Sequence, residues 1–152
     1  DKKSKERNRL RLEIISRVAE RSKVEVSQEM ISEQLDKMIA GFDEDLHQRG
    51  MELSMHLAHL NKTQDDLRKD WRPEAEKQVI FALILKKTIV DNNLTPSDKE
   101  IEKGVSQMVQ AILARGEVSQ ENLDLAGISE VVANNLANEK AFAFLEKSFL
   151  DK

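Results

Sequence analysis

Hydrophobic side chains recur every three or four positions along most of the chain, which is the spacing of an amphipathic α-helix. No stretch of five or more residues alternates convincingly between apolar and polar side chains, so the pattern predicts no β-strand. We expect five main helices, over about residues 5–21, 27–49, 64–90, 96–115 and 129–149, and two short ones, over about residues 52–60 and just after Ser119. The predicted fold class is all-α.

Residues that favour the start or the end of a helix occur between these predicted helices. Ser27 is a good N-cap, and Gly50 and Gly116 are placed to end the helices before them in the left-handed conformation that glycine tolerates. Thr63 and Asp66 have the spacing of a capping box, with Asp in place of the usual Glu. These positions predict two helix starts and two helix ends.

Further signals for helix starts and breaks lie in the second half of the chain. Pro73 should kink or divide the long helix, because a proline removes one hydrogen bond and crowds the preceding turn. Thr95 is predicted to be the next N-cap, with Pro96 at the first helical position, and Ser129 is predicted to cap the last helix. Beyond Pro73 the long helix is apolar nearly all round, which predicts that it is central to its domain or covered by another element.

The composition agrees with a helical domain. The 152 residues are enough for one domain with a sizeable core, and 39% of them are hydrophobic and 34% charged. One Trp, five Phe and no Tyr are few aromatic residues for this length, which favours an elongated helical body. The chain has no cysteine, so disulfides and zinc–thiolate sites are excluded.

The charge balance predicts neither nucleic acid nor membrane as a partner. The chain has 24 basic and 28 acidic residues, for a net charge of −4, and no apolar run approaches the length of a membrane span. No signal peptide is recognisable. Six basic residues nevertheless crowd the first eleven positions, and we interpret them as a solvated helix start, with nucleic-acid binding as a minor alternative: Lys2, Lys3, Lys5, Arg7, Arg9 and Arg11.

Two histidines raise the question of a metal site. His56 and His59 are three residues apart, so on a helix both side chains can approach one ion, with Glu52 and Asp65 as further ligands. The favoured interpretation is two partly exposed histidines without a metal. The chain also lacks a nucleophile-elbow sequence and a Gly-rich phosphate loop. We therefore predict no enzyme activity, no metal and no cofactor.

The methionines are the more informative residues. Met38 and Met108 lie on clear apolar stripes and are expected to fill the core, as is Trp71. Met51 and Met55 belong to the short helix, which cannot bury both of its sides without a covering element. For these two, core packing and a surface for a partner remain equally open, since methionine suits surfaces that accept many partners.

The order of features along the chain resembles the C-terminal chaperone domain of trigger factor, the ribosome-associated bacterial folding factor. The resemblance covers residues 24–108 well, and residues 139–145 are similar to that domain's closing helix. It rests on a helix from Ser27 to Arg49 closed by Gly50, a short helix with Leu57 and Leu60, the start Thr63-x-x-x-Leu67, a long helix with Ala75, Val79, Leu83 and Ile89, and then Leu94-Thr95-Pro96-Ser97-Asp98-Lys99-Glu100-Ile101.

The resemblance implies an elongated multi-helix domain with helical arms. Residues 1–22 would be a basic leading helix, residues 27–115 the helical body and arm, and residues 119–150 the closing helices of a single domain. Ser27 stands where the family often has proline. The family's ribosome-docking loop and prolyl-isomerase domain have no counterpart here, and the chain opens with Asp1 rather than Met. We therefore expect a piece of a longer protein.

The function that the resemblance implies is that of an ATP-independent cytoplasmic holdase. Its partners would be unfolded or nascent polypeptides, with the ribosome bound only through other domains and a weak homodimer as a further expectation. The alternative is an interaction domain for one folded partner. Eight apolar residues are expected to contact clients: Met51, Leu53, Met55, Leu57, Leu60, Phe81, Phe142 and Phe144.

Overall fold

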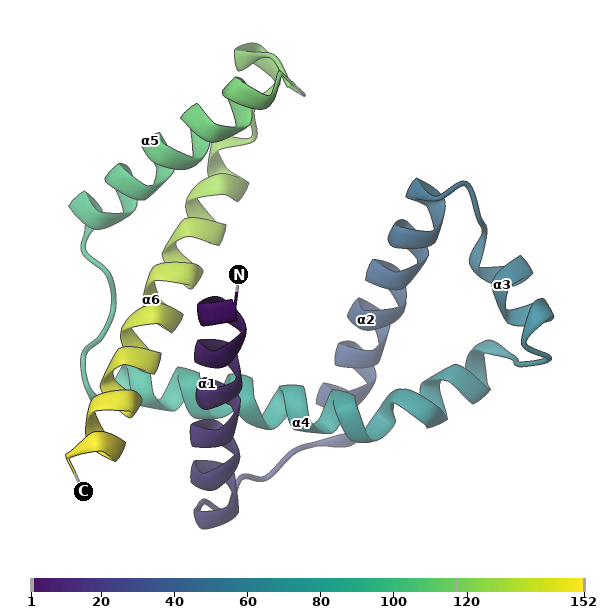
Figure 1. Cartoon of the computed structure of the whole chain (residues 1–152), viewed down its shortest axis with the longest axis horizontal. Helices are drawn as coiled ribbons and strands as arrows, with labels where there is room; N and C mark the ends of the chain where they lie inside the picture. Colours follow the sequence, from purple (N-terminus) through teal and green to yellow (C-terminus); the bar gives the residue numbers. More distant parts are fainter. Residues whose placement is uncertain (1, 117, 152) are drawn as a thin grey trace. The chain divides into compact units, whose positions relative to one another are not determined.

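The computed structural model describes residues 2–116 and 118–151, and within these residues it consists of helices joined by short connections (Figure 1). The prediction of an all-α fold is confirmed, because no strand occurs in the described part of the chain. The elements are α1 (Lys2–Arg21), α2 (Gln28–Gln48), α3 (Leu53–His59), α4 (Gln64–Asp91), α5 (Asp98–Arg115), the 3-10 helix η1 (Gln120–Asn122) and α6 (Leu125–Leu150).

The chain folds as two compact units. One unit comprises Asp1–Ile14 and Leu85–Lys152, and the other comprises Ile15–Ile84. Each unit has its own packing and is described by itself. The division into a leading helix, a body with an arm and closing helices in one domain stays a prediction.

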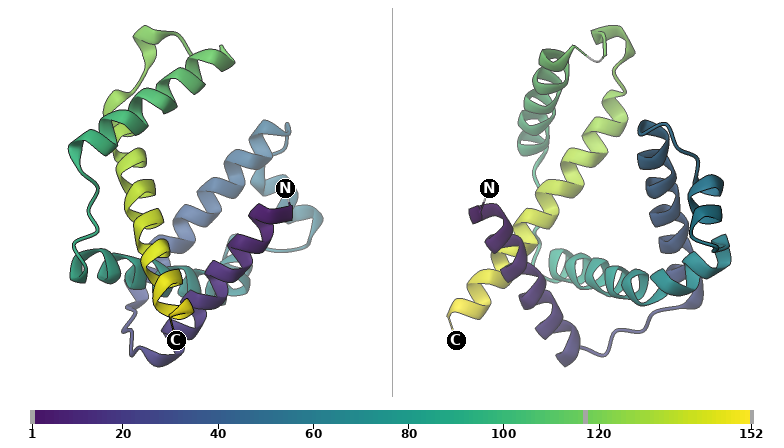
Figure 2. Two further views of the ribbon diagram at one scale, coloured as in Figure 1. Left: turned by 60° about the vertical axis from the view of Figure 1, so that its left-hand side comes forward. Right: turned by 45° about the vertical axis from the view of Figure 1, so that its right-hand side comes forward.

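In the unit Ile15–Ile84, α2, α3 and the first part of α4 follow one another as three sides of a triangle (Figure 2). Two small cores hold them together. Ile31 and Leu35 of α2 pack with Ala75 of α4, whereas Ile39 of α2, Leu57 of α3 and Leu67 of α4 form the second core. Ile31, Leu35 and Ile39 are four residues apart, so one face of α2 serves both cores. The predicted core position of Trp71 is confirmed, because it packs against both.

Arg68 of α4 reinforces the packing of α4 on α2. It donates hydrogen bonds to Asp36 and, at 2.8 Å, to the Ser32 hydroxyl. Farther along the same two helices, the side-chain amide of Gln34 donates to that of Gln78 at 2.8 Å. Apolar contacts and polar cross-links together therefore join α2 to α4.

In the other unit, α5 and α6 run side by side in opposite directions (Figures 1 and 2). Gly104 marks their closest approach, since a β-carbon at this position would lie 2.5 Å from Cγ1 of Val132. Lys140 of α6 adds an ion pair with Glu100 of α5, with Nζ 2.9 Å from Oε2. The α5 helix contributes no fully buried side chain, so its apolar stripe, including Met108, is only half covered.

Gly104→Ala is expected to lower the free energy of unfolding by about 1 kcal/mol, because overpacking against the stiff, β-branched Val132 outweighs the better helix propensity of alanine. The matched control is Gly41→Ala in α2, where a β-carbon would meet no described atom within 4 Å. This control should gain up to about 1 kcal/mol. Urea unfolding measures both, and equal stabilisation by the two changes would contradict a tight contact at Gly104.

Most of the predicted helix ends are confirmed. The Ser27 hydroxyl accepts from the Met30 amide at 3.2 Å, and Thr63 and Asp66 exchange the hydrogen bonds of a capping box. Gly50 and Gly116 have φ of 71° and 70°, the left-handed region that favours glycine.

The predicted starts of α5 and α6 are wrong. The N-cap of α5 is Ser97, not Thr95, because the Ser97 hydroxyl accepts from the Glu100 amide and the Glu100 carboxylate accepts from the Ser97 amide, which completes a reciprocal capping box. The last helix begins at Leu125 instead of near Ser129, since the Asp124 carboxylate accepts from the amide of Gly127 at 3.0 Å.

Pro73 does not divide α4. Of the two outcomes expected at Pro73, a kink or a division, the division is wrong, because the helix continues from Gln64 to Asp91 with Pro73 inside it. Leu67 before the proline and Ala75 after it are both buried against α2, and packing on both sides holds the helix in one piece. Tertiary contacts thus override the local preference of proline.

Candidate functional site

The apolar residues expected to contact clients fall into groups with different exposure. Around α3, the residues Met51, Met55 and Leu60 are 38%, 57% and 53% exposed. Leu53 is half-buried against the second core, and Leu57 is buried inside it. The three exposed residues, Met51, Met55 and Leu60, are called the α3 surface below. Leu57 belongs to the second core and is only 7% exposed, so it offers a client little surface.

The geometry of a short helix explains this exposure. Leu53 and Leu57 are four residues apart and lie on the same side of α3, where they meet the second core. Met55 lies midway between them in sequence, about 200° round the helix from each, so it points away from that core. Asn61, with φ of 52°, ends the helix before another turn forms. One face of α3 is therefore anchored while its other apolar side chains face solvent.

Phe81 lies in α4, within the unit Ile15–Ile84, and is half-buried. It lines an open groove of about 260 Å³ together with Ser16, Ala19, Pro73, Glu76, Lys77 and Ile80. The ammonium of Lys77 lies 5.6 Å from the centre of the Phe81 ring. This groove offers a second, mainly apolar recess on the same unit.

Phe142 and Phe144 belong to α6 in the other unit and are described there. Phe142 is half-buried beneath the guanidinium of Arg11, which is 4.7 Å from the ring centre. Phe144 is exposed. Within the unit Ile15–Ile84, five of the expected residues lie on or beside α3.

Sequence reasoning missed several exposed apolar side chains. Seven further large ones face solvent among the described residues: Leu10, Leu12, Val90, Val118, Leu125, Val131 and Leu150. Three of these, Leu125, Val131 and Leu150, lie on α6. The signal that points to them is the distribution of apolar residues round all sides of this 26-residue helix, more than α5 alone can cover.

The histidines lie beside the α3 surface without forming a metal site. The His56 ring packs edge-on against Phe42, with centroids 5.4 Å apart. Nδ1 of His47 is 3.5 Å from the Asp43 carboxylate. Among residues 2–116 and 118–151, no group of three or more His, Cys, Asp or Glu side chains is arranged to hold a metal ion.

Charged groups lie along another side of α3. A second open groove, of about 580 Å³, is lined by both polar and apolar residues: Asp43, His47, Glu52, Leu53, Ser54, Leu57, Lys62 and Gln64. Lys62 also pairs with Asp70, and this carboxylate raises the pKa of the Lys62 ammonium. Charges of both signs therefore line this groove, on the side of α3 that carries Leu53 and Leu57.

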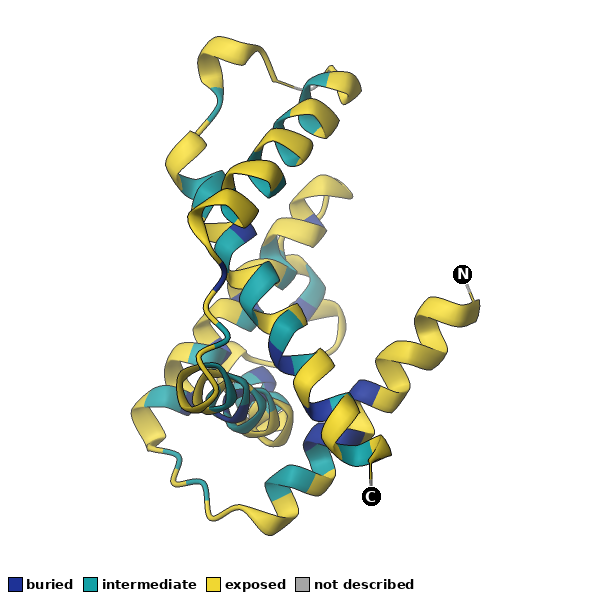
Figure 3. Ribbon diagram, turned by 90° about the vertical axis from the view of Figure 1, so that its left-hand side faces the viewer, coloured by how far each residue is buried: buried dark blue, intermediate teal, exposed yellow. Residues whose placement is uncertain are grey.

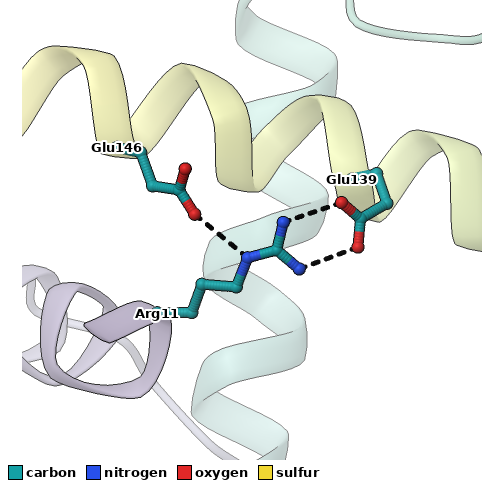
Figure 4. A network of polar contacts seen from close by, with 3 residues as sticks. All are labelled: Arg11, Glu139 and Glu146. Carbon is teal, nitrogen blue, oxygen red and sulfur yellow. Dashed lines mark hydrogen bonds and ion pairs between the residues drawn. The ribbon is translucent and has the colours of Figure 1, made fainter. Parts of the chain in front are cut away.

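Arg11 corrects the interpretation of the basic start of α1. The first turns of α1 are exposed, as expected of a solvated helix (Figure 3). Arg11, however, is buried, and its guanidinium donates two hydrogen bonds of 2.7 Å to Glu139 and one of 3.0 Å to Glu146 (Figure 4). The hydrogen bonds with Glu139 are the main cause that raises the pKa of Arg11, which therefore stays charged.

The same network acts on its carboxylates. The hydrogen bonds from Arg11 hold the pKa of Glu139 below its ordinary value. At the α5–α6 contact, Lys140 and the Ser97 cap together lower the pKa of Glu100 to about 2. Both carboxylates are therefore ionised at neutral pH and serve as structural links.

No described helix is both long and apolar enough to cross a bilayer.

Comparisons with known proteins agree with this architecture. The family described as Bacterial trigger factor protein (TF) C-terminus matches residues 1–147. A trigger factor from Bacillus pumilus is 29% identical over 145 residues, which cover 95% of this chain and 33% of the relative. A trigger factor from Alkaliphilus oremlandii is 30% identical over 133 residues, covering 86% of this chain and 31% of the relative.

The chain spans about a third of the length of these relatives. No solved structure is significantly similar to it. The family match extends over nearly all of the 152 residues, including both structural units. The chain therefore belongs to the family of the trigger factor C-terminus.

Proposed function

We propose that this chain is an ATP-independent chaperone domain that holds unfolded or nascent polypeptides in the cytoplasm through exposed apolar side chains. The observation that carries the proposal is the α3 surface, where Met51, Met55 and Leu60 face solvent while Leu57 keeps α3 anchored. Membership of the trigger factor C-terminus family supports it. Phe81, Phe142 and Phe144 are secondary contacts in the same proposal.

The hydrophobic effect supplies the binding energy. An unfolded chain that covers the α3 surface removes apolar area from water, at about 25 cal/mol for each Å². Methionine adapts its shape to different clients, which suits a surface that accepts many partners. Small exposed areas of this kind give weak, reversible binding, which a holdase needs in order to release its client for folding.

Replacing the α3 surface by serine tests the proposal. The variant Met51→Ser, Met55→Ser, Leu60→Ser should bind an unfolded client roughly tenfold more weakly, because it loses most of the apolar area that the client covers. The measurements are fluorescence anisotropy with a labelled unfolded client and light scattering of an aggregating client. The control is Val90→Ser, which changes an exposed apolar residue outside the expected client contacts.

Two results would count against the proposal. Unchanged client affinity in the triple variant would remove the α3 surface from the mechanism. A saturable complex of the unmodified chain with one folded protein, together with indifference to unfolded chains, would favour the interaction-domain alternative instead.

A further inference from the structure

Methionine is the sulfur-containing residue type of this chain. The chain has five methionines and no cysteine. Met51 and Met55, both in the α3 surface, are exposed, whereas the other three methionines are half-buried: Met30, Met38 and Met108. Because oxidation of a thioether follows its exposure, an oxidant that reaches this chain meets the sulfur atoms of Met51 and Met55 first.

The position of Met55 makes its oxidation compatible with the fold. Leu57 holds α3 in the second core, and Met55 points away from that core. An oxygen atom added to Sδ of Met55 therefore enters solvent, where its dipole is hydrated. Met38 is different, since it packs against Ile31, Leu35 and Ala75, where a sulfoxide would lack hydrogen-bond partners.

We propose that Met51 and Met55 form an oxidation-sensitive modification site that weakens client binding while leaving the fold intact. The inference rests on the proposed function. Hydrogen peroxide transfers one oxygen atom to Sδ as its O–O bond breaks, an S–O bond forms and water is released. The thioether is oxidised by two electrons and the peroxide is reduced. A methionine sulfoxide reductase supplied with a dithiol reverses the change, releasing the oxygen as water.

The order of exposure gives the site its selectivity. At low oxidant the α3 surface becomes polar and the two cores remain intact. Only at higher oxidant do half-buried methionines such as Met38 react, and the fold is then damaged. A change of surface chemistry thus precedes loss of structure, which distinguishes a reversible modification from general oxidative damage.

Peptide mass mapping of the full chain during graded hydrogen peroxide treatment tests the selectivity. Sulfoxide should form at Met51 and Met55 at least roughly fivefold faster than at Met38 and Met108. After oxidation at Met51 and Met55 alone, the thermal midpoint and helical circular dichroism should be unchanged. Equal oxidation rates at all five methionines, or unfolding at this stage, would overturn the inference.

Client affinity tests the consequence. The doubly oxidised chain should bind a labelled unfolded client roughly tenfold more weakly, and reductase with dithiol should restore the affinity. The variant Met51→Leu, Met55→Leu keeps the apolar surface without its sulfur, so it should bind clients before and after peroxide alike. Met108→Leu is the matched control and should remain sensitive to peroxide.

The outcomes separate this inference from the function on which it rests. Client binding that is equal before and after selective oxidation overturns the inference alone. Absence of client binding in the unoxidised chain and in the double leucine variant overturns the proposed function, and the regulatory role of the site with it.

Discussion

Leu35→Ala is expected to lower the free energy of unfolding by about 3 kcal/mol, the typical loss for a leucine removed from a packed core. Leu35 is 3% exposed and packs with Ile31 and Ala75 in the core that joins α2 to α4. The packed neighbours relax only partly into the cavity that the substitution leaves, so most of its cost remains. The thermal midpoint should fall by about 10 °C, measured by circular dichroism.

The matched control is Leu60→Ala, in the same unit but on the α3 surface. Since Leu60 is 53% exposed, its truncation should change stability by less than about 0.5 kcal/mol. The order of the two effects should be reversed for client binding. Leu60→Ala is expected to weaken the affinity for a client, whereas Leu35→Ala should leave it intact below the unfolding temperature of that variant. Equal loss of stability in both variants would contradict the assignment of Leu35 to the core and Leu60 to the surface.

Arg11→Met should lower the free energy of unfolding by about 2 kcal/mol. The change removes the guanidinium that links α1 to α6 and leaves the Glu139 and Glu146 carboxylates without their partner. Breaking a fully buried ion pair costs about 3–5 kcal/mol, but the Glu139 side chain is 57% exposed and regains hydration, so the expected loss is smaller. Urea unfolding at neutral pH measures it.

Arg9→Met is the control for the same substitution in the same helix. Arg9 pairs only with Glu6 at 2.8 Å among the described contacts, and both side chains are largely exposed. Exposed pairs of this kind contribute less than about 0.5 kcal/mol. A loss at Arg9 as large as the loss at Arg11 would contradict the structural role of the buried network.

The effect of Arg11→Met should depend on pH in a defined direction. The pKa of Glu139 is lower in the folded protein than its ordinary value of 4.5, because Arg11 donates hydrogen bonds to it. A group with a depressed pKa contributes its stabilisation above the ordinary value and loses it as the pH falls through the folded value. The stability difference between the unmodified chain and Arg11→Met should therefore be constant above pH 4.5 and shrink below it.

Helices were predictable because their signals are local. The spacing of Ile31, Leu35 and Ile39 defines the buried face of α2, and Gly50 ends the segment through its own backbone preference. Where two local signals compete, as at Thr95 and Ser97, the reciprocal bond with Glu100 selects the start of the helix. Pro73 shows the limit of such signals, since packing on both of its sides keeps α4 continuous.

Local signals did not predict which apolar residues of the candidate site face solvent. Leu57 and Met55 are both apolar and only two residues apart, yet one is in the core and the other is exposed. Their difference depends on Ile39 and Leu67, which approach α3 from other helices. The sequence indicated that α3 carries more apolar side chains than one face needs, and only the packing shows which of them are left over.

By itself, the sequence determined the all-α class, most helix ends and the family resemblance, because these depend on residues a few positions apart. Tertiary structure alone decided that Arg11 is buried rather than solvated, since its partner Glu139 lies 128 positions away. It also decided that Met51, Met55 and Leu60 form the exposed α3 surface. Burial depends on which distant side chains the fold brings into contact, and the spacing of neighbouring residues does not identify those side chains.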